Sequence, residues 1–153
     1  MNRPDFTRNR QLKMDPESAQ AGTGAAFEAQ IENVIRALDL SYLRQVRMGI
    51  SILGRRRIAD FLVYDTSGKS LGIECKYQQG PGSAEDKLVH TITDLDGRPV
   101  KNIIVFGGKG FSRNIRGYLL STGKALEVDQ LRNYLVLYFG LKEHFEEFGQ
   151  KPS

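Results

Sequence analysis

The short apolar segment at residues 102–106 is the feature that most restricts the fold, because four of its five residues are large and apolar. A run of this length without polar alternation is typical of a strand that is covered on both faces. Apolar residues recur at helical spacing on both sides of it, in residues 84–95 and 112–120. A buried strand between two amphipathic helices predicts an α/β fold.

The upstream half of the chain predicts one helix and three strands. Residues 24–38 place apolar side chains at helical spacing, and Thr23 before them is a suitable N-cap. A tight turn is expected at residues 66–69, whose Thr-Ser-Gly-Lys sequence separates two β-rich runs. The predicted extended segments are 42–53, 58–64 and 71–77.

A short strand at residues 125–128 and a last amphipathic helix complete the pattern. We therefore predict an α/β fold with a central mixed β-sheet flanked by helices, in the order αβββαβα with this strand and helix appended. We expect one domain over residues 23–148, because the chain has 153 residues and ordinary globular composition. A flexible basic arm (1–22) and a disordered tail (149–153) are expected to flank it.

Several classes of protein are disfavoured by composition. The single cysteine, Cys75, excludes an internal disulfide framework, and one cysteine with the chain's two histidines makes a poor set of zinc ligands. No apolar run approaches the roughly 20 residues that cross a bilayer, and the N-terminus lacks the apolar core of a signal peptide. We expect a cytoplasmic protein without membrane contact, of prokaryotic, phage or organellar origin.

Basic residues are concentrated in two segments that contain no acid. Residues 40–59 hold five arginines, and residues 97–126 hold six lysines and arginines. This distribution predicts a basic surface that meets a polyanion, although a solvated charged surface would have the same composition. We expect DNA phosphate contacts from Arg55, Arg56, Arg57, Lys109 and Arg113.

Charged residues also interrupt two strands where apolar residues prevail. Asp60 lies within the run at 58–64, and Glu74 and Lys76 lie within the run at 71–77. Alternate strand residues share a face, so Glu74, Lys76 and Gln78 are expected to point one way and Cys75 the other. A hairpin would bring Asp60 beside Glu74, and two adjacent carboxylates require either a cation or a shared proton. Mg²⁺, which prefers oxygen ligands, meets that requirement. An exposed polar strand face is the competing interpretation.

The spacing of these residues resembles the signature of the PD-(D/E)XK nuclease superfamily. Asp60 is followed by thirteen residues and then by Glu74-Cys75-Lys76. The Gly-Ala-Ala-Phe-Glu sequence at 24–28 is similar to the helix that often carries a glutamate in this superfamily. The resemblance covers about residues 24–110 and implies a restriction-endonuclease-like core.

One position departs from the family pattern, and a longer stretch that begins at Glu74 agrees with it. Ala59 stands where the signature has proline, at a position that varies in the superfamily. Residues 74–88 are similar to the stretch after the signature in several restriction-type and phage-type members.

The resemblance implies roles for individual residues. Asp60 and Glu74 would ligate one or two Mg²⁺ ions, with the Cys75 carbonyl and the helical Glu28 as further ligands. Mn²⁺ is expected to substitute for Mg²⁺. Lys76 would orient the attacking water and stabilise the charge that develops on the phosphate.

Two further assignments come from the residues themselves and leave alternatives open. Gln78 is a secondary catalytic candidate, because its amide could donate to the phosphate or the water, and a polar strand end is an equal alternative. Glu32 lies one helical turn after Glu28 on a similar face, so spacing alone does not decide between them.

These features together predict a Mg²⁺-dependent endodeoxyribonuclease that hydrolyses phosphodiester bonds, expected to act on duplex DNA. A Holliday-junction resolvase of the same fold is the first alternative. A non-catalytic nucleic-acid-binding module and a protein-interaction domain are the others. We expect a homodimer or a higher symmetric homo-oligomer, because two-fold DNA matches a two-fold protein.

Overall fold

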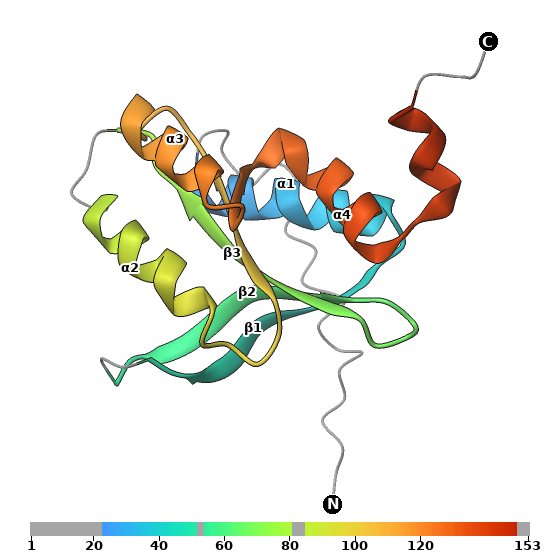
Figure 1. Cartoon of the computed structure of the whole chain (residues 1–153), viewed down its shortest axis with the longest axis horizontal. Coiled ribbons are helices and arrows are strands. Elements are labelled where there is room, and N and C mark those ends of the chain that lie inside the picture. Colours follow the sequence, from blue (N-terminus) through green and yellow to red (C-terminus); the bar gives the residue numbers. More distant parts are fainter. Residues whose placement is uncertain (1–22, 52–53, 81–84, 150–153) are drawn as a thin grey trace, which may run out of the picture.

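The computed structural model describes residues 23–51, 54–80 and 85–149. The predicted arm at 1–22 and the last four residues of the predicted tail lie outside these ranges. Figure 1 shows a sheet with helices on both sides. In chain order the elements are α1 (Gly24–Ala37), β1 (Ser41–Ile50), β2 (Arg56–Tyr64), β3 (Ser70–Tyr77), α2 (Glu85–Leu95), β4 (Asn102–Gly107), α3 (Arg113–Ser121), β5 (Ala125–Glu127), the 3₁₀ turn Val128–Gln130, α4 (Leu131–Phe139) and the 3₁₀ segment Lys142–Glu147.

Helix α1 forms where the sequence predicts it. The hydroxyl of Thr23 accepts a hydrogen bond from the backbone N–H of Ala26 at 3.0 Å, so the predicted N-cap is confirmed. Phe27, Ile31 and Ile35 are buried on one face of the helix. Because these residues recur at helical spacing, α1 covers the sheet with a continuous apolar stripe.

The five strands form one mixed sheet in the order β1-β2-β3-β4-β5. The first three strands pair antiparallel, and β3, β4 and β5 pair parallel. Gly72 of β3 lies beside Asn102 of β4, and Ile73 lies beside Ile103. The predicted α/β fold with a central mixed sheet and its element order is therefore confirmed.

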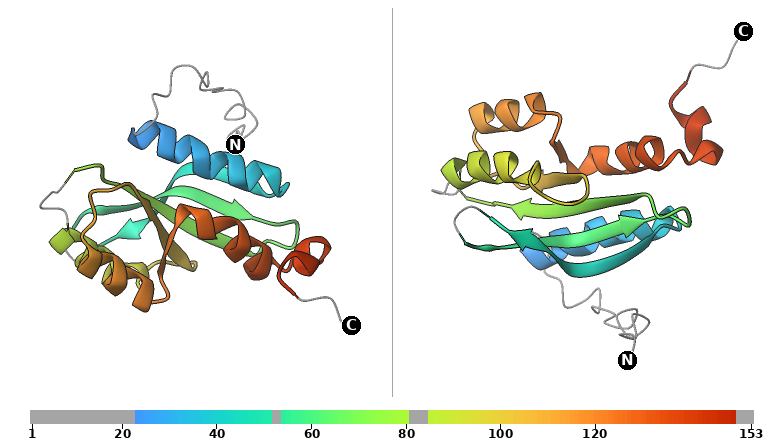
Figure 2. Two further views of the ribbon diagram at one scale, coloured as in Figure 1. Left: turned by 90° about the horizontal axis from the view of Figure 1, so that it is seen from above. Right: turned by 60° about the horizontal axis from the view of Figure 1, so that its bottom comes forward.

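Two apolar cores lie on the two faces of the sheet. One contains the buried side chains of α1 and α4, and the other contains those of α2 and α3. In the left view of Figure 2 the blue helix α1 lies on one side of the sheet, and α2 (yellow-green) and α3 (orange) lie on the other. β4 contributes to both cores, since Ile103 and Val105 face the first and Ile104 and Phe106 the second. Coverage of both faces explains the uninterrupted apolar run of β4 from Ile103 to Phe106.

The boundaries agree with the prediction to within a few residues. β1 ends at Ile50, although the sequence predicted an extended segment to residue 53, and residues 52–53 lie outside the described ranges. No helix in the described part of the chain has the length and apolar composition to cross a membrane.

Candidate active site

Asp60 lies at the point where β2 and β3 stop pairing. The paired residues of these strands end at Phe61 and Ile73, and Asp60 is the next residue of β2. Its Oδ2 atom accepts a hydrogen bond of 2.7 Å from the backbone N–H of Cys75. The carboxylate thus takes the place of a backbone acceptor in β2. The predicted hairpin therefore fixes Asp60 against the backbone of the residue that follows Glu74.

Glu28 reaches the same place from α1. One carboxylate oxygen each from Glu28 and Asp60 and the Cys75 sulfur all lie within 4.8 Å of one another. Burial, and then the negative charge of Asp60, raise the pKa of Glu28. Arg44 opposes this shift by donating to Glu28 at 2.8 Å. Two carboxylates that repel each other in a partly buried position form an oxygen-rich site suited to a hard divalent cation.

The structure distinguishes between the two glutamates of α1. Glu28 lies in the group with Asp60, whereas Glu32 pairs with Arg36 at 2.9 Å and with Arg44 at 3.5 Å. Glu28 is therefore the helical acid that the fold brings to Asp60. Spacing alone left this choice open because both residues lie on similar faces of α1.

The Cys75 side chain does not suit a magnesium site. Burial raises the pKa of its thiol, and the charges of Asp60 and Glu28 raise it further. The thiol therefore stays protonated at neutral pH, while metal-bound cysteine is a thiolate. The oxygen donors of Glu28, Asp60 and Glu74 fit Mg²⁺ or Mn²⁺, and the backbone carbonyl of Cys75 remains the proposed ligand from that residue.

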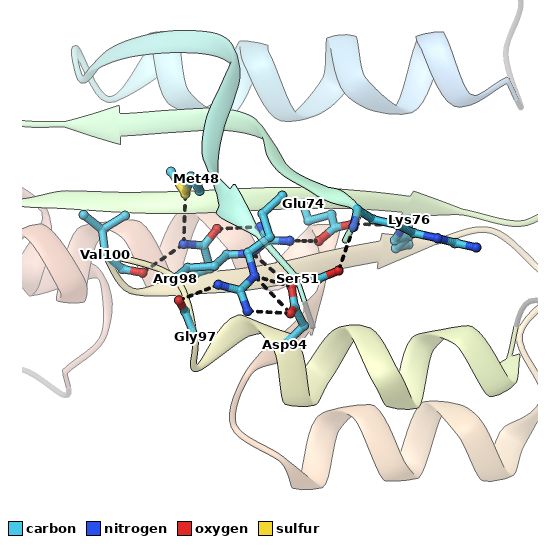
Figure 3. A network of polar contacts seen from close by, with 11 residues as sticks. Met48, Ser51, Glu74, Lys76, Asp94, Gly97, Arg98 and Val100 are labelled. Carbon is cyan, nitrogen blue, oxygen red and sulfur yellow. Dashed lines mark hydrogen bonds and ion pairs between the residues drawn. The ribbon is translucent and has the colours of Figure 1, made fainter. Parts of the chain in front are cut away.

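Glu74 and Lys76 meet in a polar network on the β3 face that α2 covers (Figure 3). The Lys76 Nζ atom lies 3.0 Å from Glu74 Oε1, which agrees with the predicted shared face. Arg98 donates from Nη2 to Glu74 Oε2 at 3.0 Å. Both oxygens of Glu74 therefore have a cationic partner. The cluster of Glu28, Asp60 and Cys75 lies on the α1 side of the sheet, where β2 and β3 stop pairing. The predicted site residues therefore occur as two adjoining groups.

Gln78 is engaged in holding a loop. Its Nε2 atom donates to the Gly80 carbonyl at 2.9 Å and to the Gly110 carbonyl at 3.2 Å. A Cβ at Gly108, whose φ is +95°, would lie 2.2 Å from the Gln78 carbonyl oxygen. The loops after β3 and β4 are therefore packed closely together around Gln78, which favours the structural alternative for this residue.

The predicted DNA-contacting residues differ in their surroundings. The side chains of Arg55, Arg56, Lys109 and Arg113 belong to exposed residues. Arg57 instead donates from Nε and Nη2 to Asp94 at 2.9–3.0 Å and from Nη1 to the Gly97 carbonyl at 2.7 Å. The structure thus gives Arg57 an internal partner that the sequence did not indicate.

Gln45 is a site residue that the sequence did not reveal. It stands opposite Asp60, because Arg44 pairs with Phe61 and Val46 pairs with Ala59. Its φ is 54°, a left-handed conformation that is rare for residues other than glycine. Its Nε2 atom donates to Asp60 Oδ1 at 3.2 Å. Backbone strain of this kind concentrates at functional positions, but no local sequence signal marks it.

Arg98 and Asp94 are two further residues of the polar network that the sequence did not indicate. Each lies in a segment whose charges look like an ordinary exposed surface in sequence. Their partners, Glu74 and Arg57, are distant along the chain and are brought to them only by the packing of α2 on the sheet.

Comparison with solved structures gives distant similarities. The protein VC1899 from Vibrio cholerae is 15% identical, with a TM-score of 0.46 over 80% of this chain and 33% of that one. A repair endonuclease from Pyrococcus abyssi is 18% identical, with a TM-score of 0.36 over 65% of this chain and 46% of that one. EndoMS in its dsDNA2 complex is 18% identical, with a TM-score of 0.34 over 71% of this chain and 47% of that one. This chain thus spans less than half the length of each of these proteins.

Comparison by sequence finds a family model that matches most of the chain. No curated protein matches this chain in sequence. A family model described as the PD-(D/E)XK nuclease superfamily domain matches residues 19–141, which include Asp60, Glu74, Lys76 and the helical Glu28. With the observed mixed sheet and element order, this match confirms the expected restriction-endonuclease-like core: the chain belongs to the PD-(D/E)XK nuclease superfamily.

Proposed function

We propose that this protein is a divalent-metal-dependent endonuclease that hydrolyses phosphodiester bonds in duplex DNA. The observation that carries the proposal is the position of the superfamily residues at the fork between β2 and β3. Asp60 of β2 is hydrogen-bonded to the backbone directly after Glu74 of β3, and Glu28 joins it from α1. Asp60 and Glu28 thus come together where β2 and β3 stop pairing, and Glu74, directly before Cys75 in β3, lies in the adjoining group with Lys76.

The proposed metal ligands are Asp60, Glu28 and Glu74, with the Cys75 carbonyl completing the set. An ion held there would supply Lewis acidity and lower the pKa of a bound water. Asp60 is fixed by Cys75 and by Gln45, so its carboxylate keeps one orientation. Relief of the repulsion between Asp60 and Glu28, which raises the pKa of Glu28, favours binding of a cation.

Lys76 is the proposed partner of the phosphate and the attacking water. Its side chain is 36% exposed, and its ion pair is with Glu74. An ion pair that is partly open to water is weak, so Lys76 can exchange Glu74 for a phosphate oxygen at little cost in free energy. From that position its ammonium would stabilise the charge that develops as the phosphodiester bond is cleaved.

The exposed basic residues are proposed to place the DNA. Arg55 directly precedes β2 and Arg56 begins it, a few residues before Asp60, and Lys109 and Arg113 follow β4. Such contacts fix the position of a duplex without reading its sequence. We further propose that the protein works as a symmetric homo-oligomer, because each site would cut one strand.

The test is a cleavage assay with supercoiled plasmid and with a synthetic four-way junction. Reactions contain Mg²⁺ or Mn²⁺ in the millimolar range, with parallel reactions in EDTA. Lys76→Ala is compared with Lys142→Ala, which removes a lysine from the exposed 3₁₀ segment Lys142–Glu147. We expect metal-dependent cutting that is lost in Lys76→Ala and kept in Lys142→Ala.

Each outcome of the assay has a distinct meaning. Preferred cutting of the junction would assign the protein to the resolvases. DNA binding that needs no metal, with no cleavage of either substrate, would contradict the proposal and indicate a binding module. Absence of both binding and cleavage would leave the strand carboxylates with a purely structural role.

A further inference from the structure

Arg98 is a buried charge next to a residue of the superfamily motif. It lies between α2 and β4, and its side chain is only 4% exposed. An arginine removed from water is costly unless ion pairs and hydrogen bonds compensate. Here the compensation includes the hydrogen bond of 3.0 Å from Nη2 to Glu74 Oε2. A charge kept in such a position serves the group that it contacts.

A second contact anchors the guanidinium from the side of β4. Its Nη1 atom donates to Asn102 Oδ1 at 3.0 Å. Asn102 is itself 4% exposed, and its amide nitrogen donates to the Val100 carbonyl at 2.9 Å, which orients its oxygen toward Arg98. Gly72 leaves the space for this amide, because a Cβ there would lie 2.2 Å from Asn102 Oδ1. The Arg98 contact therefore rests on a closely packed support.

A third group approaches Arg98 from α2. Asp94 Oδ2 lies 3.9 Å from Arg98 Nε, and Asp94 is held in turn by Arg57 of β2. Figure 3 shows Glu74, Arg98 and Asp94 in one connected network between β3 and α2. Arg98 is thus surrounded by groups from α2, β3 and β4 and has no room to swing away.

The two carboxylate oxygens of Glu74 therefore contact partners that differ in burial and in their freedom to move. Oε2 is bound to Arg98 at 4% exposure, and Oε1 lies 3.0 Å from Lys76 at 36% exposure. Lys76 can leave Glu74 because its ammonium has water around it, whereas Arg98 cannot. When a cation or a phosphate changes the balance of charge, Oε1 is the oxygen that becomes available.

We infer that Arg98 is a positioning residue, which holds Oε2 of Glu74 so that Oε1 is presented to the divalent ion while Lys76 moves to the phosphate. The inference rests on the proposed nuclease function. It assigns a role to a residue outside the superfamily signature and explains why both oxygens of Glu74 are paired. Arg98 acts through Glu74 and touches neither the metal nor the DNA.

The experiment measures Mn²⁺ binding by the loss of the free-ion signal in electron paramagnetic resonance, together with the Mn²⁺ dependence of plasmid cleavage. Arg98→Lys keeps the charge but loses the fork that binds Glu74 and Asn102 together. Arg132→Lys is the matched control, since Arg132 lies on α4 and pairs with Glu147 of the 3₁₀ segment Lys142–Glu147. We expect Arg98→Lys to weaken Mn²⁺ binding by about 10–100-fold, the usual effect of losing a group that orients a metal ligand. Excess Mn²⁺ should restore part of the rate.

The outcomes separate the inference from the proposed function. A purely structural arginine would lower the unfolding temperature of Arg98→Lys and leave the Mn²⁺ affinity within about two-fold of wild type, which would overturn the inference alone. A wild-type protein that neither binds Mn²⁺ nor cuts DNA would overturn the proposed function and the inference with it. If Arg98→Lys does not fold, Mn²⁺ binding to Asn102→Ala tests the inference instead. This variant removes the hydrogen bond from Arg98 to Asn102, and we expect a loss of Mn²⁺ affinity that is measurable but smaller than about 10-fold. An unchanged affinity would reject the inference.

Discussion

The three adjacent arginines Arg55, Arg56 and Arg57 should have different roles. We expect Arg57 to stabilise the fold and Arg55 and Arg56 to contact DNA. Arg57 donates three hydrogen bonds to the Asp94 carboxylate and one to the Gly97 carbonyl. Arg55 and Arg56 are exposed. Alanine substitutions at these three positions, one at a time, therefore compare neighbours of the same residue type in different environments.

The magnitude follows from the burial of the pair. The side chains of Arg57 and Asp94 are 17% and 22% exposed, between a surface pair and a buried one. Exposed ion pairs contribute about 0–1 kcal/mol, and removal of one partner of a fully buried pair costs about 3–5 kcal/mol. We expect Arg57→Ala to lower the free energy of unfolding by about 2 kcal/mol. For a protein of this size that corresponds to a fall of about 4–8 °C in unfolding temperature.

The assay is urea or thermal unfolding followed by circular dichroism. Arg55→Ala and Arg56→Ala should change the free energy of unfolding by no more than about 0.5 kcal/mol. Asp94→Ala and the double variant Arg57→Ala/Asp94→Ala complete a double-mutant cycle. The two single losses should not add, because both variants remove the same interaction.

Effects on DNA binding should be the opposite of those on stability: Arg55→Ala and Arg56→Ala should weaken binding, and Arg57→Ala should not. If Arg55 and Arg56 each contact a phosphate, each alanine variant should reduce the slope of log K against log salt concentration by about 1. Arg57→Ala should leave this slope unchanged. Equal destabilisation by all three substitutions, or a loss of salt slope confined to Arg57→Ala, would refute this reasoning.

Three further predictions concern the core and the buried polar groups. Ile31→Ala, at a fully buried position of α1, should cost about 2–5 kcal/mol in a denaturant titration, and Leu137→Ala, at 60% exposure, should cost far less. The Tyr134 hydroxyl is buried with no hydrogen-bond partner among the described residues, so Tyr134→Phe should unfold at the same or a higher temperature. Burial also raises the pKa of Tyr134, so the folded state holds its proton more tightly and wild-type stability should fall relative to Tyr134→Phe above about pH 10. Because the pKa of the Cys75 thiol is raised, iodoacetamide should modify it slowly at about pH 8.5 in the native protein and rapidly in urea, and rapid native modification would contradict the described environment.

The elements of the fold were predictable because their signals are local. Apolar residues at helical spacing identified α1, and the uninterrupted apolar run identified β4 as a strand covered on both faces. The Thr23 cap was visible for the same reason, since a hydroxyl three residues before its N–H partner needs no distant contact.

The candidate site was predictable only in part. Strand alternation placed Glu74 and Lys76 on one face, and their ion pair agrees with it. The position of Asp60 at the backbone of Cys75 depends on where β2 and β3 cease to pair, which hairpin geometry decides and residue type does not. The left-handed backbone of Gln45 gave no signal, because glutamine has no preference for that conformation.

The order of helices and strands, the family and the residues of its signature follow from the sequence alone. These depend on periodicity and on spacing along the chain, which local physical chemistry specifies. Which basic residue each acidic residue pairs with depends on how the elements pack in the folded protein. It paired Glu74 with Arg98 and Asp94 with Arg57, across separations of 24 and 37 residues. The physical reason is that such pairs form where α2 packs on the sheet, and a partner chosen by packing leaves no pattern in the sequence on either side of it.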